Sequence, residues 1–248
     1  MKKEFYNKNI IVTGASSGLG REVCLCLDLL GANLILVGRN KKSLNKTKSL
    51  MKRKHEYVLC DLSNLNDTKK KIKTIFKKKQ FDGLVHGAGD YLLSPIQLVS
   101  EKEIINSINT NLTSPYLITK EFCKRNNYKQ GASIVFVSSV AGFVGSSSLS
   151  VYSMTKSGQI GLVKSLAVEM SSKKVRINSV SPGLIDSRIS NVLSSSMTEE
   201  SFESIKKKHL LGVGKYSDVA SSILFLLSEK NKWITGSNLI VDGGYSIN

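Results

Sequence analysis

Short apolar runs alternate along the chain with longer segments whose apolar residues recur at helical spacing. The runs have the length and aliphatic character of buried strands and cover residues 9–13, 33–37, 57–60, 81–85, 133–137, 174–180 and 238–241. Helical spacing is found over 18–30, 69–79, 101–125, 152–170, 198–208 and 218–227. The alternation predicts one α/β domain over residues 1–248, with a doubly wound parallel sheet of about seven strands and helices on both faces.

A glycine-rich turn joins the first predicted strand to the first helix. Its glycines would let the backbone approach a pyrophosphate, and the free N–H groups at the start of the helix would favour that anion. A glycine motif carries weight only in such a strand–turn–helix setting. The turn therefore predicts a dinucleotide site, with expected contacts from Gly14, Ser16, Ser17, Gly18, Leu19 and Gly20.

The end of the second predicted strand indicates which dinucleotide is bound. In such folds an acidic residue about twenty positions past the glycines binds a ribose 2′-hydroxyl, whereas an arginine suits a 2′-phosphate. Arg39 stands nineteen residues beyond Gly20, with Lys41 and Lys42 close behind and no acidic neighbour. A guanidinium can grip phosphate with two hydrogen bonds and stack on adenine. The sequence therefore favours NADP(H) and leaves NAD(H) as the alternative.

Polar or glycine-containing segments follow the later strands as well. Asp61, after the third strand, is placed to reach an adenine amino group, although capping the next helix is a fair rival role. His86 opens a second small-residue turn, Gly87 to Gly89, where backbone can pass close to a ligand. Asn111 is polar among apolar helical neighbours, so it serves either a local backbone contact or a site.

The helix near residue 152 carries Tyr152 and Lys156, which project from one face one turn apart. A free tyrosine has a pKa of about 10 and exchanges protons poorly near neutrality. A fixed ammonium nearby favours the phenolate and lowers that pKa, which would make Tyr152 a usable acid or base. Alone, this spacing is more often an ordinary surface pair, and it gains weight from the turns described above.

Charge is the unusual feature of an otherwise ordinary globular composition. Hydrophobic residues make up 41% and charged residues 22% of the chain, but the net charge is +17, carried mostly by scattered lysines. A basic surface can attract nucleic acid, an acidic membrane, a nucleotide phosphate or an acidic carrier protein. A solvated, lysine-rich surface is the simpler interpretation, also for the lysine-covered helix at 69–79. We therefore expect no nucleic-acid partner.

Cysteine and histidine placement argues against two further classes of protein. The four cysteines fit reduced thiols better than a disulfide framework. His55, His86 and His209 are isolated from other metal-binding side chains, so no metal site is expected. Residues 1–10 lack the apolar core of a signal peptide, and no apolar stretch is long enough to span a membrane. The expected location is the cytoplasm, without a membrane partner.

Together these motifs resemble the short-chain dehydrogenase/reductase family, in its short single-domain form, over essentially the whole chain. The glycine turn has that family's spacing, Gly87 to Gly89 matches its second turn, and Val241 to Gly244 matches its C-terminal signature. His86 departs from the family's asparagine, from which we expect altered packing rather than lost activity. The resemblance implies a Rossmann-like fold and a catalytic set of Asn111, Ser139, Tyr152 and Lys156. The implied cofactor contacts are Arg39, Asp61, Leu62, Gly87, Ala88, Gly89, Tyr152, Lys156, Pro182, Gly183 and Ile185.

The resemblance also implies a reaction, in which hydride passes between a nicotinamide and a carbonyl or secondary alcohol. In the reductive direction Tyr152 would donate its proton to the substrate oxygen, and Ser139 would hydrogen-bond that oxygen. Lys156 would lower the pKa of Tyr152 and hold the nicotinamide ribose. Asn111, with a bound water, would link Lys156 to solvent. The polar, serine-rich segment 184–214 is expected to form a substrate lid.

Within the family, the pattern most resembles the 3-oxoacyl-(acyl-carrier-protein) reductases of fatty-acid synthesis. That likeness implies a substrate delivered on an acidic carrier protein. Basic residues expected beside the site to receive it are Lys124, Arg125, Lys129, Lys173 and Lys174. Against the assignment, the segment from His209 to Gly214 lacks the Pro-Leu-Gly-Arg run common in that group.

Two other functions remain open. The main alternative is an NADP-dependent reductase or dehydrogenase of a sugar or another small carbonyl compound, for instance in surface-polysaccharide synthesis. A remote alternative is a catalytically silent regulator that binds a nucleotide. In either enzyme, the resemblance implies a homotetramer paired through the helices that carry Asn111 and Tyr152.

Overall fold

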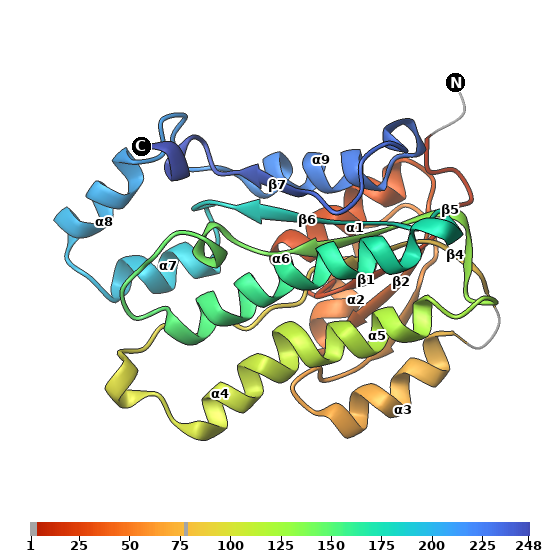
Figure 1. Cartoon of the computed structure of the whole chain (residues 1–248), viewed down its shortest axis with the longest axis horizontal. Helices are drawn as coiled ribbons and strands as arrows, with labels where there is room; N and C mark the ends of the chain where they lie inside the picture. Colours follow the sequence, from red (N-terminus) through yellow and green to blue (C-terminus); the bar gives the residue numbers. More distant parts are fainter. Residues whose placement is uncertain (1–3, 77–78) are drawn as a thin grey trace.

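A computed structural model describes residues 4–76 and 79–248, which contain a seven-stranded parallel sheet (Figure 1). Its strands are β1 (Asn9–Thr13), β2 (Asn33–Gly38), β3 (Glu56–Leu59), β4 (Phe81–His86), β5 (Tyr128–Val137), β6 (Arg176–Pro182) and β7 (Asn238–Val241). Their order is β3-β2-β1-β4-β5-β6-β7, so the direction of chain growth reverses between β1 and β4. Ligands of open α/β sheets bind where that reversal opens a crevice at the carboxyl ends of the strands. The predicted fold class is confirmed.

Helices cover both faces of the sheet. They are α1 (Gly18–Leu29), α2 (Lys41–Ser49), α3 (Leu65–Ile75), α4 (Glu101–Ile108), α5 (Ser114–Phe122), α6 (Ser150–Met170), α7 (Arg188–Ser195), α8 (Glu199–Lys207) and α9 (Tyr216–Leu227). Helices α3, α5 and α6 pack on one face, while α1, α2 and α9 pack on the other (Figure 1). Helices α7 and α8 lie beyond the carboxyl end of β6, within the predicted lid.

Burial on both faces explains why the strands are continuous apolar runs. Along β1, Ile10 and Val12 belong to the core beneath α1 and α9, and Ile11 belongs to the core beneath α3, α5 and α6. All three side chains are essentially inaccessible to solvent. Burying each of these side chains stabilises the fold by about 1.5–3 kcal/mol, so a polar residue facing either side of the sheet would be costly.

Some helices differ from the expectation because local contacts, such as capping hydrogen bonds, determine where they form. Helix α2 lacks apolar periodicity; the Asn40 carboxamide caps its start by accepting from Ser43 N at 2.8 Å, and only Leu44 and Thr47 are buried. The helical segment expected over 101–125 runs without a break from residue 101 to 122, but a π-helical turn, Asn109–Thr113, divides it into α4 and α5. Helix α7 was not anticipated in its serine-rich segment, where Ser187 and Ser190 form a capping box.

The lysine-rich helix was expected to extend to residue 79, but α3 ends at Ile75. Ile72, Ile75 and Phe76 are buried, as their spacing indicated. Lys77 and Lys78, which belong to the same prediction, lie outside the described residues. Within residues 4–76 and 79–248, no helix is both long and apolar enough to cross a membrane.

Candidate active site

The two glycine turns meet at the switch point of the sheet, backbone against backbone. A Cβ on Gly14, whose φ is +72°, would lie 2.6 Å from the Gly87 carbonyl oxygen. A Cβ on Gly20 would lie 2.3 Å from the carbonyl oxygen of Gly14 itself. Neither position has room for a side chain, so α1 begins directly against the end of β1. This close approach is what the dinucleotide prediction required of the first turn.

The start of α1 leaves donors for an anion. Ser17 is its N-cap residue in extended conformation, but its side chain makes no capping hydrogen bond. The first N–H groups of a helix have no partners within it and attract negative charge. Ser16 borders the same crevice, since its Oγ is 3.4 Å from where a Cβ of Gly38 would be. The turn fits a pyrophosphate, with Gly18 and Leu19 providing the first helical amides.

Arg39 follows β2 and is exposed at the carboxyl edge of the sheet. Its charge acts on Asp90 in the second turn: burial raises the pKa of the Asp90 carboxyl, and the Arg39 guanidinium partly opposes that rise. The two charged groups therefore border the same crevice, on either side of β1. That is the place where the ribose of a dinucleotide would meet Arg39.

Asp61 has a local role that the sequence did not indicate. Its Oδ1 accepts hydrogen bonds from Ser63 N at 3.1 Å and from Ser63 Oγ at 2.8 Å. The helix cap is Asn64, whose side chain accepts from the N–H groups of residues 66 and 67, so the N-cap role considered for Asp61 was wrong. Leu62 is buried, and its carbonyl accepts from Ser114 Oγ at 2.7 Å. Contact of Asp61 with adenine stays a prediction.

The turn after β6 is held from two sides. A Cβ on Gly183 would lie 2.9 Å from both Asp242 and the His209 ring. Leu184 N donates to His209 Nε2 at 2.9 Å, and Ile185 forms a β-bridge with Gly214. His209 seemed isolated in the sequence, yet it joins the far end of the predicted lid to the turn at Pro182 and Gly183. These contacts tie both ends of the 184–214 segment to the site.

Ser139 and Tyr152 come together beside the end of β5. Ser139 follows that strand and caps a short 3-10 turn, its Oγ accepting from Ala141 N at 3.2 Å. Tyr152 lies in the first turn of α6 with only 8% of its surface exposed. Burial raises the pKa of Tyr152 above its usual range, a hydrogen bond with Ser139 opposes the rise, and Tyr91 and Asp90 add to it. The phenol is therefore held protonated at neutral pH.

Lys156 lies deeper than Tyr152 and is nearly inaccessible. Its Nζ donates to the Val137 carbonyl at 2.7 Å and lies 5.5 Å from the centre of the Tyr152 ring. Burial lowers the pKa of Lys156 to about 7. We expected the ammonium to lower the pKa of Tyr152, but Lys156 is not among the groups that shift it here. Burial disfavours charge on both groups, so in the free protein it favours the neutral phenol and the neutral amine over an ion pair.

Asn111 braces the second turn rather than reaching Lys156. It sits in the π-helical turn, and its side-chain Oδ1 accepts from Asp90 N at 2.8 Å while Nδ2 donates to Asp90 O at 3.0 Å. The same Nδ2 donates to Thr155 Oγ1 at 3.0 Å. Of the two roles left open for Asn111, a purely local backbone contact is wrong, because the backbone that it bonds lies 21 residues away. Its catalytic role stays a prediction. Single-turn π-helices occur often at functional sites.

Three side chains at the site were missed. Gln159 is fully buried between Lys156 and Asn111, and Thr155 bridges Asn111 to the Tyr152 carbonyl. Tyr91 packs edge-on against Tyr152, with ring centres 5.0 Å apart. A usable signal existed for Gln159, because a polar residue three positions after Lys156 lies on the inward face of the helix. Nothing in the sequence indicated Tyr91.

The basic residues expected beside the site lie at the wrong end of the chain's fold. Lys129 is the second residue of β5 and pairs with Asp82, whose carboxylate also accepts from the first residue of β1. Lys173 and Lys174 follow the end of α6, about 30 Å along that helix from Tyr152. Lys124 and Arg125 follow the end of α5, near the same amino edge. The prediction was wrong because the helices run antiparallel to the strands, so a helix end lies opposite the carboxyl ends of the sheet.

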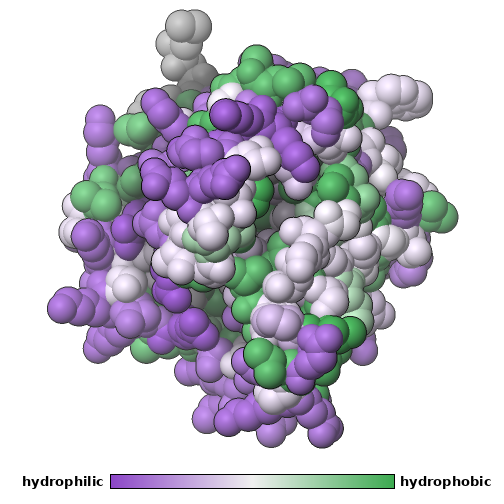
Figure 2. Space-filling model, turned by 90° about the vertical axis from the view of Figure 1, so that its left-hand side faces the viewer, coloured by the Kyte–Doolittle hydropathy of each residue, from purple (hydrophilic) through white to green (hydrophobic). Residues whose placement is uncertain are grey.

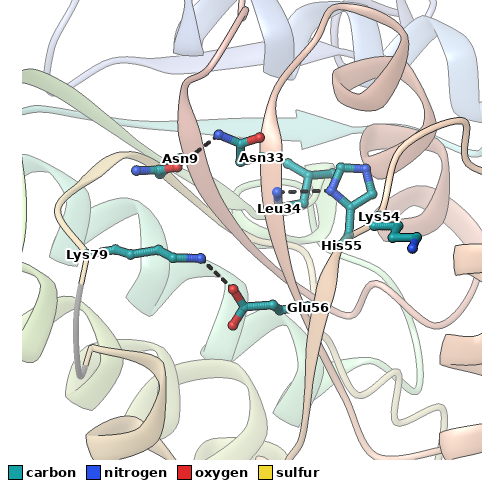
Figure 3. Close-up of a pocket in the computed structure, with 7 residues that line it drawn as sticks. All are labelled: Asn9, Asn33, Leu34, Lys54, His55, Glu56 and Lys79. Carbon is teal, nitrogen blue, oxygen red and sulfur yellow. Dashed lines mark hydrogen bonds and ion pairs between the residues drawn. The ribbon is translucent and has the colours of Figure 1, made fainter.

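The amino edge also carries a hollow of about 280 Å³ (Figure 3), lined by Asn9, Asn33, Leu34, Lys54, His55, Glu56 and Lys79. In it Lys79 pairs with Glu56, and His55 Nδ1 accepts from Leu34 N at 3.2 Å. None of the residues predicted for the site lines it. Among the described residues, no three histidine, cysteine or acidic side chains gather as a metal would require.

Apolar surface gathers at the opposite end, where the strands terminate. Figure 2 views the molecule from that end and shows apolar side chains along the hollowed middle of the face, with hydrophilic ones crowding one side. Exposed apolar residues from the loops and the predicted lid there are Ile96, Leu98, Phe143, Ile189, Val192, Leu210 and Leu211. Fold, glycine turns and buried acid–base groups together define a nicotinamide-dinucleotide oxidoreductase.

Comparison with known proteins gives the family. The sequence model of a family described as enoyl-(acyl carrier protein) reductase matches residues 14–246. The chain is 32% identical to the 3-oxoacyl-(acyl-carrier-protein) reductase FabG of Buchnera aphidicola, over 96% of both chains. It is 33% identical to carbonyl reductase family member 4 of Danio rerio, over 96% of this chain and 97% of that one. The chain belongs to the short-chain dehydrogenase/reductase family, whose members bind a nicotinamide cofactor and act on carbonyl or alcohol groups.

Solved structures agree on the fold and differ in the substrates that they name. A short-chain dehydrogenase/reductase from Brucella melitensis, described as a glucose/ribitol dehydrogenase, has a TM-score of 0.89 at 28% identity and covers 99% of both chains. An aldohexose dehydrogenase from Thermoplasma acidophilum has a TM-score of 0.85 at 29% identity, over 100% of this chain and 97% of that one. The reaction class is therefore firm, while its substrate is a matter for experiment.

Proposed function

We propose that the chain is an NADP(H)-dependent 3-oxoacyl-(acyl-carrier-protein) reductase. The supporting observation is that Ser139, Tyr152 and Lys156 converge beside the two glycine turns, at the end of the sheet where apolar side chains surround the opening. An acyl thioester would bring apolar chain to that surface, which a sugar lacks. The relatives named FabG match nearly the full length of this chain and support the same substrate class.

The chain's own groups are suited to the reductive direction. When bound, the cofactor supplies hydride to the carbonyl carbon. Tyr152 then gives its phenolic proton to the carbonyl oxygen, a contribution typically of about 10²–10⁴-fold. The Ser139 hydroxyl donates a hydrogen bond to that oxygen as negative charge develops on it. Burial keeps the Tyr152 phenol protonated in the free protein, so the proton to be donated is present at neutral pH.

Lys156 would hold the nicotinamide ribose. An ammonium has three N–H donors. Two of them face the Val137 carbonyl and Gln159 Oε1, which leaves one for a ribose hydroxyl. The second turn lies beside the ammonium, since a Cβ on Gly89 would be in ordinary contact with Lys156 Nζ at 3.6 Å. Pro182, Gly183 and Ile185 would support the nicotinamide from the β6 side.

NADP(H) is favoured over NAD(H) by the charge at the edge of the crevice. Arg39 follows β2 where a 2′-phosphate would lie, and Lys41 and Lys42 begin the next helix. This preference rests on Arg39 and the two lysines that follow it. The KM values for NADPH and NADH test it directly.

A carrier protein would dock on the lid rather than on the amino edge. Lys206, Lys207 and Lys208 end helix α8 and directly precede His209, which contacts the turn at Gly183 and Leu184. An acidic carrier would find basic charge there beside the apolar opening. The proposal also includes a cytoplasmic location and a homotetramer, for which exposed Val168 on α6 and Trp233 near β7 offer apolar contact surface. Light scattering at micromolar concentration tests the tetramer.

Sugar reduction is the second candidate, favoured by the sugar dehydrogenases among the similar structures. Initial rates with acetoacetyl-CoA, an acetoacetyl carrier-protein thioester and a panel of keto sugars, each with NADPH and NADH, separate the two. We expect kcat/KM for the thioesters to exceed that for any sugar by at least about tenfold, since a missing apolar contact alone gives 10–200-fold. A sugar that outperforms both thioesters would transfer the assignment to the second candidate. NADPH binding without turnover on any compound would point to the silent regulator.

A further inference from the structure

A side-chain amide lies between Lys156 and Asn111. Gln159 is fully buried, one helical turn after Lys156 on α6. Its Nε2 donates to the Asn111 backbone carbonyl at 2.7 Å, and its Oε1 accepts from Lys156 Nζ at 3.5 Å. The first contact is short and the second lies at the outer limit of a hydrogen bond. Together they join α6 to the π-helical turn that carries Asn111.

The orientation of this amide follows from its partners. A backbone carbonyl can only accept, and an ammonium can only donate. Nε2 must therefore face Asn111 and Oε1 must face Lys156. In the flipped amide, Oε1 would meet the Asn111 carbonyl, acceptor against acceptor, and Nε2 would meet the ammonium, donor against donor. The side chain that bonds Asn111 thus turns the negative end of its dipole toward the ammonium.

We propose that Gln159 is a positioning residue of this active site: its side-chain amide links the Lys156 ammonium to the Asn111 carbonyl and so fixes where the ammonium lies and how firmly it holds its proton. The catalytic meaning of this link rests on the proposed function. The link itself does not, because it joins groups of this chain alone.

The Gln159 amide dipole matters for the Lys156 ammonium because few other groups around it stabilise the charge. Among the titratable groups, Tyr152 on α6 has its ring centre 5.5 Å from the ammonium, and Tyr91 and Asp90, which follow β4, act on Tyr152. Burial is the one cause that shifts the pKa of Lys156, to about 7, and no carboxylate offsets it. In a dry interior an oriented carbonyl stabilises a charge more than it would in water. The Val137 carbonyl and Gln159 Oε1 are then the acceptors that keep the ammonium charged near neutrality.

The test measures the titration of Lys156 without any ligand. In protein labelled with [¹³Cε]-lysine, most lysines titrate near pH 10, so a signal that moves near pH 7 stands apart. Its absence from Lys156→Met assigns it. Gln159→Met keeps the length and apolar packing of the side chain but removes Oε1 and Nε2, and we expect the midpoint to fall by at least about half a pH unit. Gln130→Met, the same exchange at an exposed position on β5, is the matched control and should leave the midpoint unchanged.

Gln159→Glu gives the opposite arm. A carboxylate in place of Oε1 should raise the midpoint by about one unit or more, since opposite charges within about 4–6 Å favour each other. Opposite shifts in the two variants support the link. An unchanged midpoint in Gln159→Met, or equal downward shifts in both variants, would show that Gln159 only fills space. If Gln159→Met does not fold, Gln159→Glu decides alone, and an unshifted midpoint there overturns the proposal.

Kinetics then separate the link from the proposed function. If reduction needs the charged Lys156, the alkaline limb of the kcat–pH profile should move in step with the NMR midpoint in each variant. A midpoint that shifts in a protein without ketone reductase activity would keep the link and discard the function. An active enzyme with an unshifted midpoint would keep the function and discard the link.

Discussion

At the amino ends of the strands the Asp28 carboxylate accepts from His55 Nε2 at 2.8 Å and from the backbone N–H groups of Lys52 at 2.7 Å and Arg53 at 3.1 Å. At the carboxyl ends, the Tyr152 phenol has Ser139 as its hydrogen-bonding side chain. Both regions bury titratable groups. Only the first surrounds its carboxylate with enough donors to favour the charged form.

The pKa shifts record this difference. Burial by itself would raise the pKa of Asp28, but the hydrogen bonds from Lys52, His55 and Arg53 hold it below its usual range. At the other end burial prevails, raising the pKa of Tyr152 and lowering that of Lys156 to about 7. A fully paired charge stabilises the fold, whereas a desolvated, under-paired group keeps bonding capacity for a substrate. The comparison predicts that substitutions at the two ends affect different properties.

The largest effect is expected from removing the proposed acid. Tyr152→Phe should lower kcat by at least about a hundredfold, because a phenyl ring has no proton to donate. Binding of NADPH, followed by fluorescence titration, should change little. The control is Tyr128→Phe at the amino end of β5, where the ring stacks on Phe122. Turnover of Tyr152→Phe equal to that of Tyr128→Phe would remove Tyr152 from the mechanism.

Substitution of Asp28 should have the opposite pattern, lowering stability while leaving turnover nearly unchanged. Asp28→Asn should reduce the free energy of unfolding by about 2–4 kcal/mol, since three charge-assisted hydrogen bonds weaken at a buried position. Turnover at 25 °C should stay near that of the wild type. The pKa of Asp28 is lowered in the fold, so its contribution is complete above the unfolded pKa and disappears as pH falls through the folded one. The difference in unfolding free energy between the wild type and Asp28→Asn, measured by urea unfolding, should therefore become smaller in acid. A difference that grows in acid would contradict this account.

His86 is a buried histidine whose protonated form has no charged partner to stabilise it, and it makes the stability of the fold depend on pH. Its Nε2 bonds Thr119 Oγ1 at 2.8 Å and its ring packs on Phe136, but Nδ1 has no partner among the described residues. Burial lowers the pKa of His86 to about 3. Since the unfolded chain takes up a proton near pH 6.5 and the folded chain does not, stability should fall by about 1.4 kcal/mol for each pH unit below 6.5.

His86→Asn should flatten that dependence. Unfolding free energies measured at pH 7.0 and 5.0 should lie closer together in the variant than in the wild type, whatever the variant's stability at pH 7.0. The neutral amide has no proton to take up in this range, which is the physical reason. Parallel pH profiles of the two proteins would show that His86 is not the acid-sensitive group.

Sequence patterns predicted the parts of this molecule that depend on periodicity and on backbone clearance. The strand Asn9–Thr13 was predicted to the residue, because buried parallel strands are continuous apolar runs. Gly14 and Gly20 were identified from their glycine-rich turn between a strand and a helix, and the structure leaves no room for a side chain at either position. Helix α2 was not found, since a cap at Asn40 and two buried residues sustain it instead of an apolar stripe.

The missed parts of the site depend on contacts between distant segments. Gln159 bonds a residue 48 positions earlier, and His209 bonds one 25 positions earlier. Tyr91 meets Tyr152 across the end of the sheet. No local pattern encodes such meetings. The basic residues between 124 and 174 were misplaced because they lie where helices end and the next strands begin, which is the edge of the sheet opposite the carboxyl ends of the strands.

The smallest effect concerns the two arginines. Arg53, at the amino edge, donates to the carbonyl of Ala32 at 3.1 Å and to Asn33 Oδ1 at 3.2 Å, so its guanidinium is engaged by the fold. Within the described part of the chain, the exposed Arg39 guanidinium has no hydrogen bond or ion pair. Arg39→Leu should lower the ratio of kcat/KM for NADPH to that for NADH by about fivefold, a modest change because a surface charge is screened by water.

Arg53→Leu is the control that completes the comparison. It should lower the melting temperature and leave the cofactor ratio unchanged, because its hydrogen bonds serve the fold alone. The ratio should also become less sensitive to salt in Arg39→Leu than in the wild type, since the attraction between guanidinium and phosphate is what salt screens. A cofactor ratio that falls equally in both variants would mean that the preference arises from the overall positive charge rather than from Arg39.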